Sequence, residues 1–305
     1  MLLYKKIEQL ENKTAIALGL FDGVHLGHKE VIEAAVKFKS SGLKATVFTF
    51  DAKCNDSLSA KTSQKIYNLK QKCQLFKNIG VEIVVCPNFD DIKNLEPIDF
   101  IEEVLIKKLQ ADVLVCGYDY HFGKGAKGDI ALLQSVANKN NISLIVINKL
   151  SVNGEKVSST KIKQYLIEGN IEDANTLLGY NYYIEKEVVQ GIKLGRTLGF
   201  PTINQQTDDN NLVVPKNGVY FTLTTIDGKK YKSITNVGIK PTIKGERQPL
   251  FETHILGTKE DLYGRFIKVE FLEFLRAEKK FDSLQTLTAA INADRLKVEQ
   301  KKSSF

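Results

Sequence analysis

Cysteine is scarce in this 305-residue chain, and long hydrophobic stretches are missing. The four cysteines form none of the close pairs that bind zinc or carry out thiol redox chemistry, so we expect reduced thiols in a core. No apolar run approaches the roughly 18 residues that a membrane helix needs. The first residues, MLLYKKIEQLENK, lack the apolar core and the cleavage site of a secretion signal. These absences predict a soluble protein that stays in the cytoplasm.

Long runs of positive charge are also missing, although the chain is basic overall. Lys and Arg total 43 against 36 Asp and Glu, which gives a net charge of +7 and a pI near 9.0. This balance suits anionic partners such as nucleotides or nucleic acid. However, the basic residues are scattered and do not alternate with aromatic ones as they do on base-stacking surfaces. We therefore expect most of them to form a solvated surface, and neither nucleic acid nor a membrane is favoured as a partner.

Hydrophobic residues, 43% of the chain, are arranged with two different periods. A length of 305 residues predicts two domains. In the first half, apolar runs without polar alternation predict strands buried on both faces, at residues 14–20, 44–50, 81–86, 111–116 and 142–147. Amphipathic stretches between them predict helices at residues 28–39, 63–80, 97–109 and 129–140. This alternation is typical of a doubly wound, Rossmann-like α/β domain with a parallel sheet.

The helical period disappears after residue 180. Residues 158–170 and 171–180 still predict helices, which we expect to close the first domain. Beyond them, Asp227–Gly228 predicts a hairpin turn, residues 251–256 and 265–276 predict further strands, and residues 282–300 predict a final helix. The sequence therefore predicts an α/β domain over residues 1–180. Residues 181–305 are expected to form an antiparallel β-barrel with a terminal helix, and a sandwich is the alternative.

A glycine-rich turn lies between the first predicted strand and its helix. This segment, GLFDGVHLGH, contains Gly23, Gly27, His25 and His28. Ligands bind at such strand-to-helix turns in open α/β sheets, because glycine lets the backbone approach a phosphate and the helix N-terminus offers free N–H groups. The two histidines can add donors at the same place. We interpret the turn as a polyphosphate cradle; chance surface placement and metal ligation are the alternatives.

This segment resembles the nucleotidyltransferase motif of bacterial bifunctional riboflavin kinase/FAD synthetases. Two later segments are similar to the same family in the same order, GYDYHFGKGAKGD at residues 117–129 and VSSTKIKQYLIEGNIEDANTLLGY at residues 157–180. The resemblance implies a nucleotidyltransferase-like first domain in which the phosphate of FMN attacks the α-phosphorus of ATP, giving FAD and pyrophosphate. It assigns catalysis to His25 and His28. The nucleotide contacts that it implies are Phe21, Gly23, Gly27, Asp119, Ser159, Thr160 and Lys163, and its flavin contacts here are Tyr120 and Phe122.

The first domain departs from the family pattern at three places. Lys53 and Cys54 stand where a histidine and a proline are usual. Lys163 and Tyr180 each stand where the family often has an arginine. Lysine does not replace an arginine that grips a phosphate with two hydrogen bonds. These departures support a second hypothesis, that of a riboflavin kinase with a weak or silent first domain.

A second glycine-rich segment, GIKLGRTLGFPTIN, covers residues 191–204. Its glycines free the backbone to fold around phosphates, and its basic side chains can supply charge. Thr202 and Asn204 lie two residues apart, so on a strand they face the same side and could hold Mg²⁺ and phosphate oxygens together. An ordinary hairpin is the alternative. The segment resembles the riboflavin kinase module. That resemblance assigns nucleotide contacts to Gly191, Lys193, Gly195, Arg196, Thr202 and Asn204.

A kinase that acts on an alcohol also needs a base, and FETHIL supplies Glu252. The resemblance matches Glu252 to the carboxylate that accepts the proton of the ribityl hydroxyl, and it places Glu252 and Arg276 at the flavin. A plain surface charge on a strand is the alternative for Glu252. His254 would face the same side two residues later, where packing is an equally good explanation.

Together, these motifs favour a two-step enzyme of flavin cofactor synthesis. Its substrates and products would be riboflavin, FMN, FAD, ATP, ADP and pyrophosphate, with ATP as co-substrate and Mg²⁺ as cofactor. Besides the kinase-only hypothesis, a flavin-responsive or nucleic-acid-binding regulator would predict salt-sensitive binding without turnover. The sequence does not predict an oligomeric state.

Overall fold

The computed structural model describes residues 1–51, 64–191, 195, 198–207, 209, 211–241, 247–258 and 260–301. Lys53 and Cys54 lie outside the described residues, and so do Lys193 and Arg196. The contacts divide the chain into two compact units, Met1–Ser159 and Thr160–Phe305.

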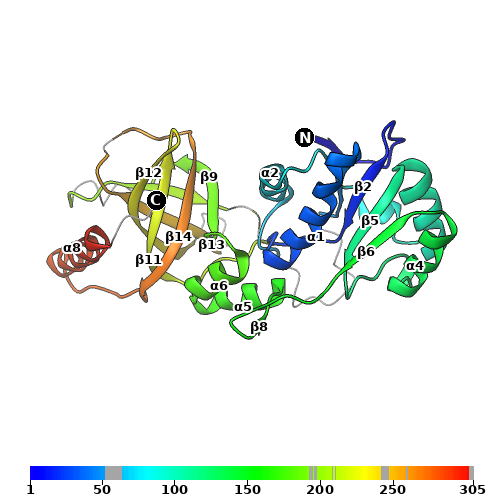
Figure 1. The fold of residues 1–305 in the computed structure, drawn as a ribbon. Coiled ribbons are helices and arrows are strands. Elements are labelled where there is room, and N and C mark those ends of the chain that lie inside the picture. Colours follow the sequence, from blue (N-terminus) through cyan, green and yellow to red (C-terminus); the bar gives the residue numbers. More distant parts are fainter. Residues whose placement is uncertain are drawn as a thin grey trace. The chain divides into compact units, whose positions relative to one another are not determined.

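The first unit is built on a six-stranded parallel sheet with the strand order β1-β4-β3-β2-β5-β6 (Figure 1). The bounds are β1 (Leu2–Tyr4), β2 (Thr14–Leu18), β3 (Lys44–Phe48), β4 (Ile83–Val85), β5 (Ala111–Gly117) and β6 (Ser143–Ile147). All five strands predicted for this half are confirmed. The sequence did not predict β1. This edge strand has only three residues, and Leu2 and Leu3 are exposed, so it lacks the buried apolar run by which the other strands were predicted.

Helices cover both faces of this sheet, as a doubly wound fold requires. One core cluster joins Ala15 and Ala17 of β2 to α1 (Leu26–Val36) and α2 (Leu69–Ile79). The other joins Ile16 and Leu18 to η4 (Phe100–Lys108) and α4 (Ile130–Lys139). The remaining short elements are η1 (Lys37–Ser41), η3 (Phe89–Asp91), α3 (Pro97–Asp99), η5 (Lys124–Ala126), β7 (Ser151–Val152) and β8 (Glu155–Lys156).

The helix predicted from residue 63 begins later, at Leu69, and that prediction was wrong at its N-terminal end. Asn68 caps α2 by accepting a hydrogen bond from Gln71 N at 3.0 Å, and the Gln71 side chain accepts one from Asn68 N. This capping box stops the helix from extending backwards. Ile66 and Tyr67, which suggested a helical face, are instead buried in a non-helical segment.

The second unit contains a closed six-stranded barrel with the order β10-β13-β12-β11-β14-β9, so the predicted antiparallel barrel is confirmed. The bounds are β9 (Tyr183–Val189), β10 (Thr202–Gln206), β11 (Gly218–Ile226), β12 (Lys229–Pro241), β13 (Arg247–Ile255) and β14 (Phe266–Arg276). Asp227 and Gly228, with φ values of 47° and 79°, form the predicted hairpin turn between β11 and β12.

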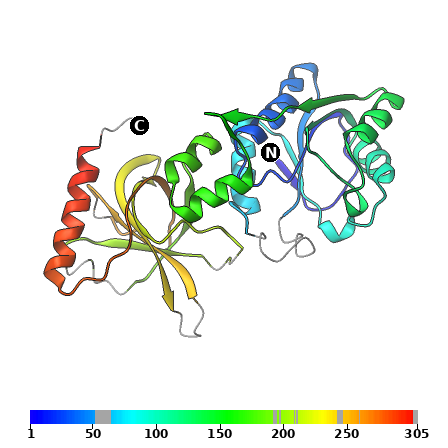
Figure 2. The same cartoon turned by 90° about the horizontal axis from the view of Figure 1, so that it is seen from below.

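The terminal helix α8 (Leu284–Gln300) lies beside the barrel (Figure 2). Ser283 is its N-cap, and its Oγ accepts a hydrogen bond from Thr286 N at 3.2 Å. Near the other end, Val298 is fully buried in a cluster with barrel residues, and Lys232 Nζ donates to Glu299 O at 2.9 Å. The helix is therefore anchored to β12 at its C-terminus.

Two helices that the sequence assigned to the first domain group with the barrel instead. They are α5 (Ser159–Glu168), from Thr160 onward, and α6 (Ile171–Leu178). Asn175 explains the grouping, because its side chain donates to Phe271 O at 2.9 Å and accepts from Tyr182 N at 2.7 Å. These bonds tie α6 to the barrel strand β14, an interaction that no local sequence pattern shows.

Neighbouring residues of α5 give a test of this packing. Leu166 is fully buried, whereas Ile167 is 54% exposed. We expect Leu166→Ala to destabilise the second unit by about 2–5 kcal/mol, because it leaves a cavity. Ile167→Ala should change the stability by only about 0.5 kcal/mol. Thermal unfolding followed by circular dichroism measures both, and equal midpoints for the two variants would contradict the packing of α5.

Candidate active sites

The turn between β2 and α1 has a left-handed backbone at three positions. Phe21, Gly23 and Val24 have φ values of 51°, 78° and 40°. The φ of Gly23 favours glycine, and a Cβ there would also lie 2.7 Å from Ile66 Cδ1. His25 ends the turn as the N-cap of α1, and its Nδ1 accepts a hydrogen bond from His28 N at 3.2 Å. The chain thus enters α1 with its free N–H groups beside the turn.

His25 and His28 are stacked, with ring centroids 3.5 Å apart and an interplanar angle of 15°. Burial lowers the pKa of His25 to about 4, and it also lowers the pKa of His28 well below the usual value. Both rings are therefore neutral near pH 7. Since His25 Nδ1 is an acceptor, its proton lies on Nε2. His28 Nδ1 is buried and has no hydrogen-bond partner within the described part of the chain.

Two of the predicted contact residues meet this turn. Ser159 Oγ donates to Asp22 O at 2.8 Å, which joins the start of α5 to the turn. Asp119 is exposed after β5, close enough for its charge to act on His25. Thr160 is exposed and Lys163 half-buried in the following part of α5, which belongs to the second unit.

The aromatic candidates of the first unit lie mostly inside the fold. The Phe21 ring is 2% exposed and packs edge-on against His28 at 5.4 Å between centroids. Tyr120 and Phe122 stack at 5.6 Å, and Phe122 is 6% exposed. Phe21 therefore supports the turn with its ring. Of the two predicted flavin contacts, Tyr120 is the more accessible, and burial raises its pKa.

Sequence reasoning missed Lys72, which lies beneath this turn. Its side chain is 4% exposed, and its Nζ donates to Leu20 O, Phe50 O and Thr49 Oγ1. In the sequence it is one of several lysines of an amphipathic helix. The available signal was its spacing of four residues from Phe76, which places both on the buried face of α2.

Strand register builds the candidate site of the second unit. Asn204 on β10 pairs with Glu252 on β13, and Glu252 pairs in turn with Asn236 on β12. Thr202 pairs with His254. Because directly paired side chains lie on the same face and alternate along a strand, these five project from one side of the sheet.

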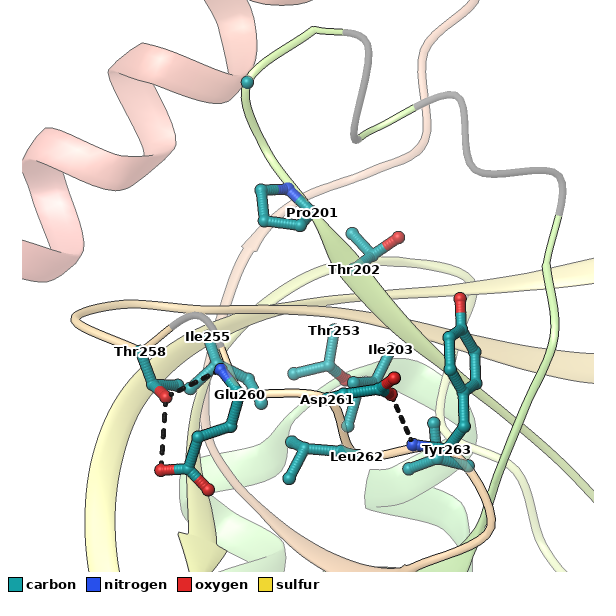
Figure 3. Close-up of a pocket in the computed structure, with 12 residues that line it drawn as sticks. Pro201, Thr202, Ile203, Thr253, Ile255, Thr258, Glu260, Asp261, Leu262 and Tyr263 are labelled. Atoms are coloured by element: carbon teal, nitrogen blue, oxygen red, sulfur yellow. Dashed lines mark hydrogen bonds between the residues drawn. The ribbon is translucent and has the colours of Figure 1, made fainter.

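Thr202 lines two neighbouring cavities. The larger, of about 450 Å³, is shown in Figure 3, where Pro201 and Thr202 lie opposite the loop that carries Asp261 and Tyr263. The smaller, of about 280 Å³, has a wall that includes Asn236, Glu252, His254, Arg276, Asp294 and Leu287. The structure thus brings the predicted Glu252 and Arg276 into one cavity and places the predicted Thr202 at both.

Two of the predicted glycines in residues 191–204 have no room for a side chain. A Cβ on Gly191 would lie 2.3 Å from Asn204 Nδ2, and one on Gly195 would lie 2.4 Å from Phe200 O. Phe200 N also donates to Gly195 O at 2.8 Å. Gly191 can therefore lie directly against Asn204, and Gly195 against Phe200.

Ion pairing fixes the wall of the smaller cavity. Arg276 Nε and Nη2 both donate to Asp294 Oδ2, at 2.9 and 2.8 Å, and Asp294 on α8 is 2% exposed. Across the cavity, His254 Nδ1 lies 2.9 Å from Pro201 O, and burial lowers its pKa. Arg276 therefore holds α8 against the barrel at the place where the sequence predicts a flavin contact.

Comparison with known proteins matches one family model to each half of the chain. The family model described as FAD synthetase matches residues 7–161, and the one described as riboflavin kinase matches residues 178–302. A bifunctional riboflavin kinase/FMN adenylyltransferase of Bacillus subtilis is 34% identical over 95% of this chain and 92% of its own. The chain belongs to this bifunctional family. A member from Escherichia coli K12 is 33% identical over 92% of this chain and 90% of its own.

A solved structure from Streptococcus pneumoniae, described as a macrolide-efflux protein, is also similar. It covers 98% of this chain and 99% of its own with a TM-score of 0.86 and 29% sequence identity. Among the described residues here, none of the helices is long and apolar enough to cross a membrane.

The stacked histidines lead to a prediction for NMR. We expect His25 to stay neutral across about pH 5–8 and to titrate near pH 4, because its ring is buried. Since the unfolded chain binds this proton near pH 6.5, stability should be fully present above that pH and should fall as the pH drops toward 4. Imidazole chemical shifts, assigned with His25→Gln, measure the pKa, and titration near pH 6.5 would contradict the buried stack.

The contact between Gly191 and Asn204 leads to a prediction about kinase activity. In Gly191→Ala the new methyl group must displace the Asn204 side chain, so riboflavin phosphorylation should fall by about 10²-fold. Adenylylation of supplied FMN should not change. Gly228→Ala, which is strained by the φ of 79° in the hairpin turn and lies outside both cavities, controls for a general loss of barrel stability. Full kinase activity in Gly191→Ala would show that Asn204 has no role in phosphorylation.

Proposed function

We propose that this chain converts riboflavin to FAD in two ATP-dependent steps, one in each unit. The observation that carries the proposal is the presence of both family domains on one chain, each with its own cluster of predicted site residues. Riboflavin is phosphorylated to FMN in the barrel unit, and FMN is adenylylated in the parallel-sheet unit. Because both steps use ATP, we further propose that the enzyme works in the cytoplasm, where ATP is available.

The two cavities of the barrel suggest how phosphorylation occurs. ATP would occupy the larger cavity and riboflavin the smaller, with the γ-phosphate near Thr202, which lines both. Glu252 lines the riboflavin cavity and would accept the proton of the terminal ribityl hydroxyl. The hydroxyl oxygen then bonds to the γ-phosphorus as the bond to ADP breaks.

Thr202 and Asn204 are the proposed Mg²⁺ ligands. Their hydroxyl and amide oxygens suit Mg²⁺, which is usually held by a few protein oxygens together with substrate phosphates. Asn204 is 6% exposed and pairs with the catalytic candidate Glu252 on the neighbouring strand, so the donors lie next to the base. Bound there, the ion would neutralise phosphate charge.

Adenylyl transfer needs no nucleophile from the protein. An oxygen of the FMN phosphate attacks the α-phosphorus of ATP, and pyrophosphate leaves. The N–H groups at the start of α1 and neutral imidazoles at His25 and His28 would donate hydrogen bonds to the triphosphate. Ser159, bonded to Asp22 O, keeps the start of α5 at this turn.

A time course separates this proposal from its alternatives. With riboflavin, ATP and Mg²⁺, FMN should rise and then give way to FAD when the flavins are separated by chromatography. Accumulation of FMN, with no FAD even from supplied FMN, would leave a kinase with a silent first unit. Absence of any conversion, together with flavin binding, would favour the regulator.

Glu252→Gln tests the catalytic assignment. Removing the base should lower the rate of riboflavin phosphorylation by about 10²–10⁴-fold, while adenylylation of supplied FMN continues. Glu187→Gln provides a matched control, because Glu187 is an exposed carboxylate on β9 outside both cavities. Equal kinase rates in the two variants would refute Glu252 as the base.

A further inference from the structure

Lys72 is a buried cation that joins the ends of two strands. From α2 its Nζ donates to Leu20 O at 2.9 Å, Phe50 O at 2.9 Å and Thr49 Oγ1 at 3.2 Å. Leu20 follows β2, whereas Thr49 and Phe50 follow β3. Thr49 Oγ1 adds a bond across the same gap by donating to Leu20 O at 2.9 Å. One ammonium group therefore ties together the carboxyl ends of the two central strands.

These hydrogen bonds fit a protonated lysine, although burial lowers its pKa. A neutral amine has two N–H bonds, whereas three oxygens accept from Lys72 Nζ, and Thr49 Oγ1 uses its own proton on Leu20 O. No carboxylate among the described residues lies within ion-pair distance of Nζ. A buried charge without a paired carboxylate is costly, so the position demands an explanation beyond stability.

The same helix holds the turn that carries the histidines. Leu20 O belongs to the peptide just before Phe21, whose φ of 51° is unfavourable for a residue with a side chain. One helical turn after Lys72, Phe76 is fully buried and packs edge-on against the Phe21 ring at 6.0 Å. Phe21 in turn packs against His28. Lys72 thus holds the peptide group that precedes Phe21, and Phe76 holds the Phe21 ring.

We propose that Lys72 is a positioning residue for adenylyl transfer, which clamps the ends of β2 and β3 and thereby fixes the turn that presents His25 and His28. This inference rests on the proposed adenylyltransferase activity of the first unit. Lys72 touches no substrate in it. The positive charge of Lys72 also lies behind the turn that we interpret as a phosphate cradle. There it favours an anionic ligand and a neutral His28.

The groups around His28 determine the direction in which its pKa changes when Lys72 is replaced. Burial lowers the pKa of His28 most, and His25 and Lys72, which face it, lower it further. Removing the charge of Lys72 should therefore raise the pKa of His28. Asp22 and Asp119 face His25, and the groups that face Lys72 are Asp22, Asp51, Cys73 and Cys86.

Lys72→Met tests the clamp, because it keeps an unbranched side chain of nearly the same length and removes all three bonds. We expect kcat/KM for FMN adenylylation to fall by about 10²-fold, as is typical when reacting groups are misplaced by about 1 Å. Riboflavin phosphorylation by the same preparation should be unchanged, which shows that the second unit is folded, and a thermal unfolding profile like that of the wild type should show the same for the first unit. Lys77→Met, an exposed lysine of the same helix, should leave both activities unchanged.

Lys72→Arg separates charge from geometry. It keeps the positive charge, so the pKa of His28, measured from imidazole chemical shifts, should stay low, whereas Lys72→Met should raise it. A general loosening of the fold would move this pKa in both variants alike. Unchanged adenylylation in Lys72→Met, or equal losses in Lys72→Met and Lys77→Met, would overturn the proposal.

Thr49→Val serves if Lys72→Met does not fold. It removes one acceptor of Lys72 and the bond to Leu20 while keeping the shape of the side chain. Adenylylation should fall with phosphorylation intact, and unchanged adenylylation would overturn the proposal. If the wild-type protein itself makes no FAD, the proposed function fails rather than the clamp, which the pKa of His28 still tests.

Discussion

Hydrogen bonding between neighbouring strands is the constraint on which both candidate sites depend. In the barrel, register alone brings Asn204, Glu252 and Asn236 into line across three strands. In the parallel sheet, pairing of β2 with β3 and β5 sets the ends of these strands at one edge, from which the turn to α1 starts. A slip of one residue in the barrel would turn Glu252 to the other face.

Burial then determines the electrostatics of each site. In the parallel-sheet unit, it keeps His25 and His28 neutral, which allows their rings to stack without repulsion. Neutral imidazoles act as oriented dipoles and require no counter-ion. In the barrel, by contrast, the Arg276 guanidinium pairs with the buried Asp294. The first site thus presents two neutral imidazoles in front of Lys72, whereas the barrel site contains an arginine whose charge is already paired.

The sequence predicted what depends on local patterns. Apolar runs marked β2 to β6, and Asp227–Gly228 marked the hairpin. It could not predict interactions between residues far apart in the chain, such as Arg276 with Asp294, or Asn175 with the barrel. Lys72 was missed for the same reason, since only the folded chain shows that its acceptors come from the ends of β2 and β3.

In the proposed reactions the two units use different means to approach a phosphate, and this difference determines which substitutions each unit tolerates. The turn after β2 relies on backbone in the left-handed region, so replacing Gly23 would strain the cradle itself. The barrel relies on side chains of regular strands, such as Thr202 and Asn204, while Gly191 supplies only space. In the first unit, therefore, function is sensitive to backbone geometry and to whatever clamps it. In the barrel, function is sensitive to the chemistry of single side chains, which can change without altering the fold.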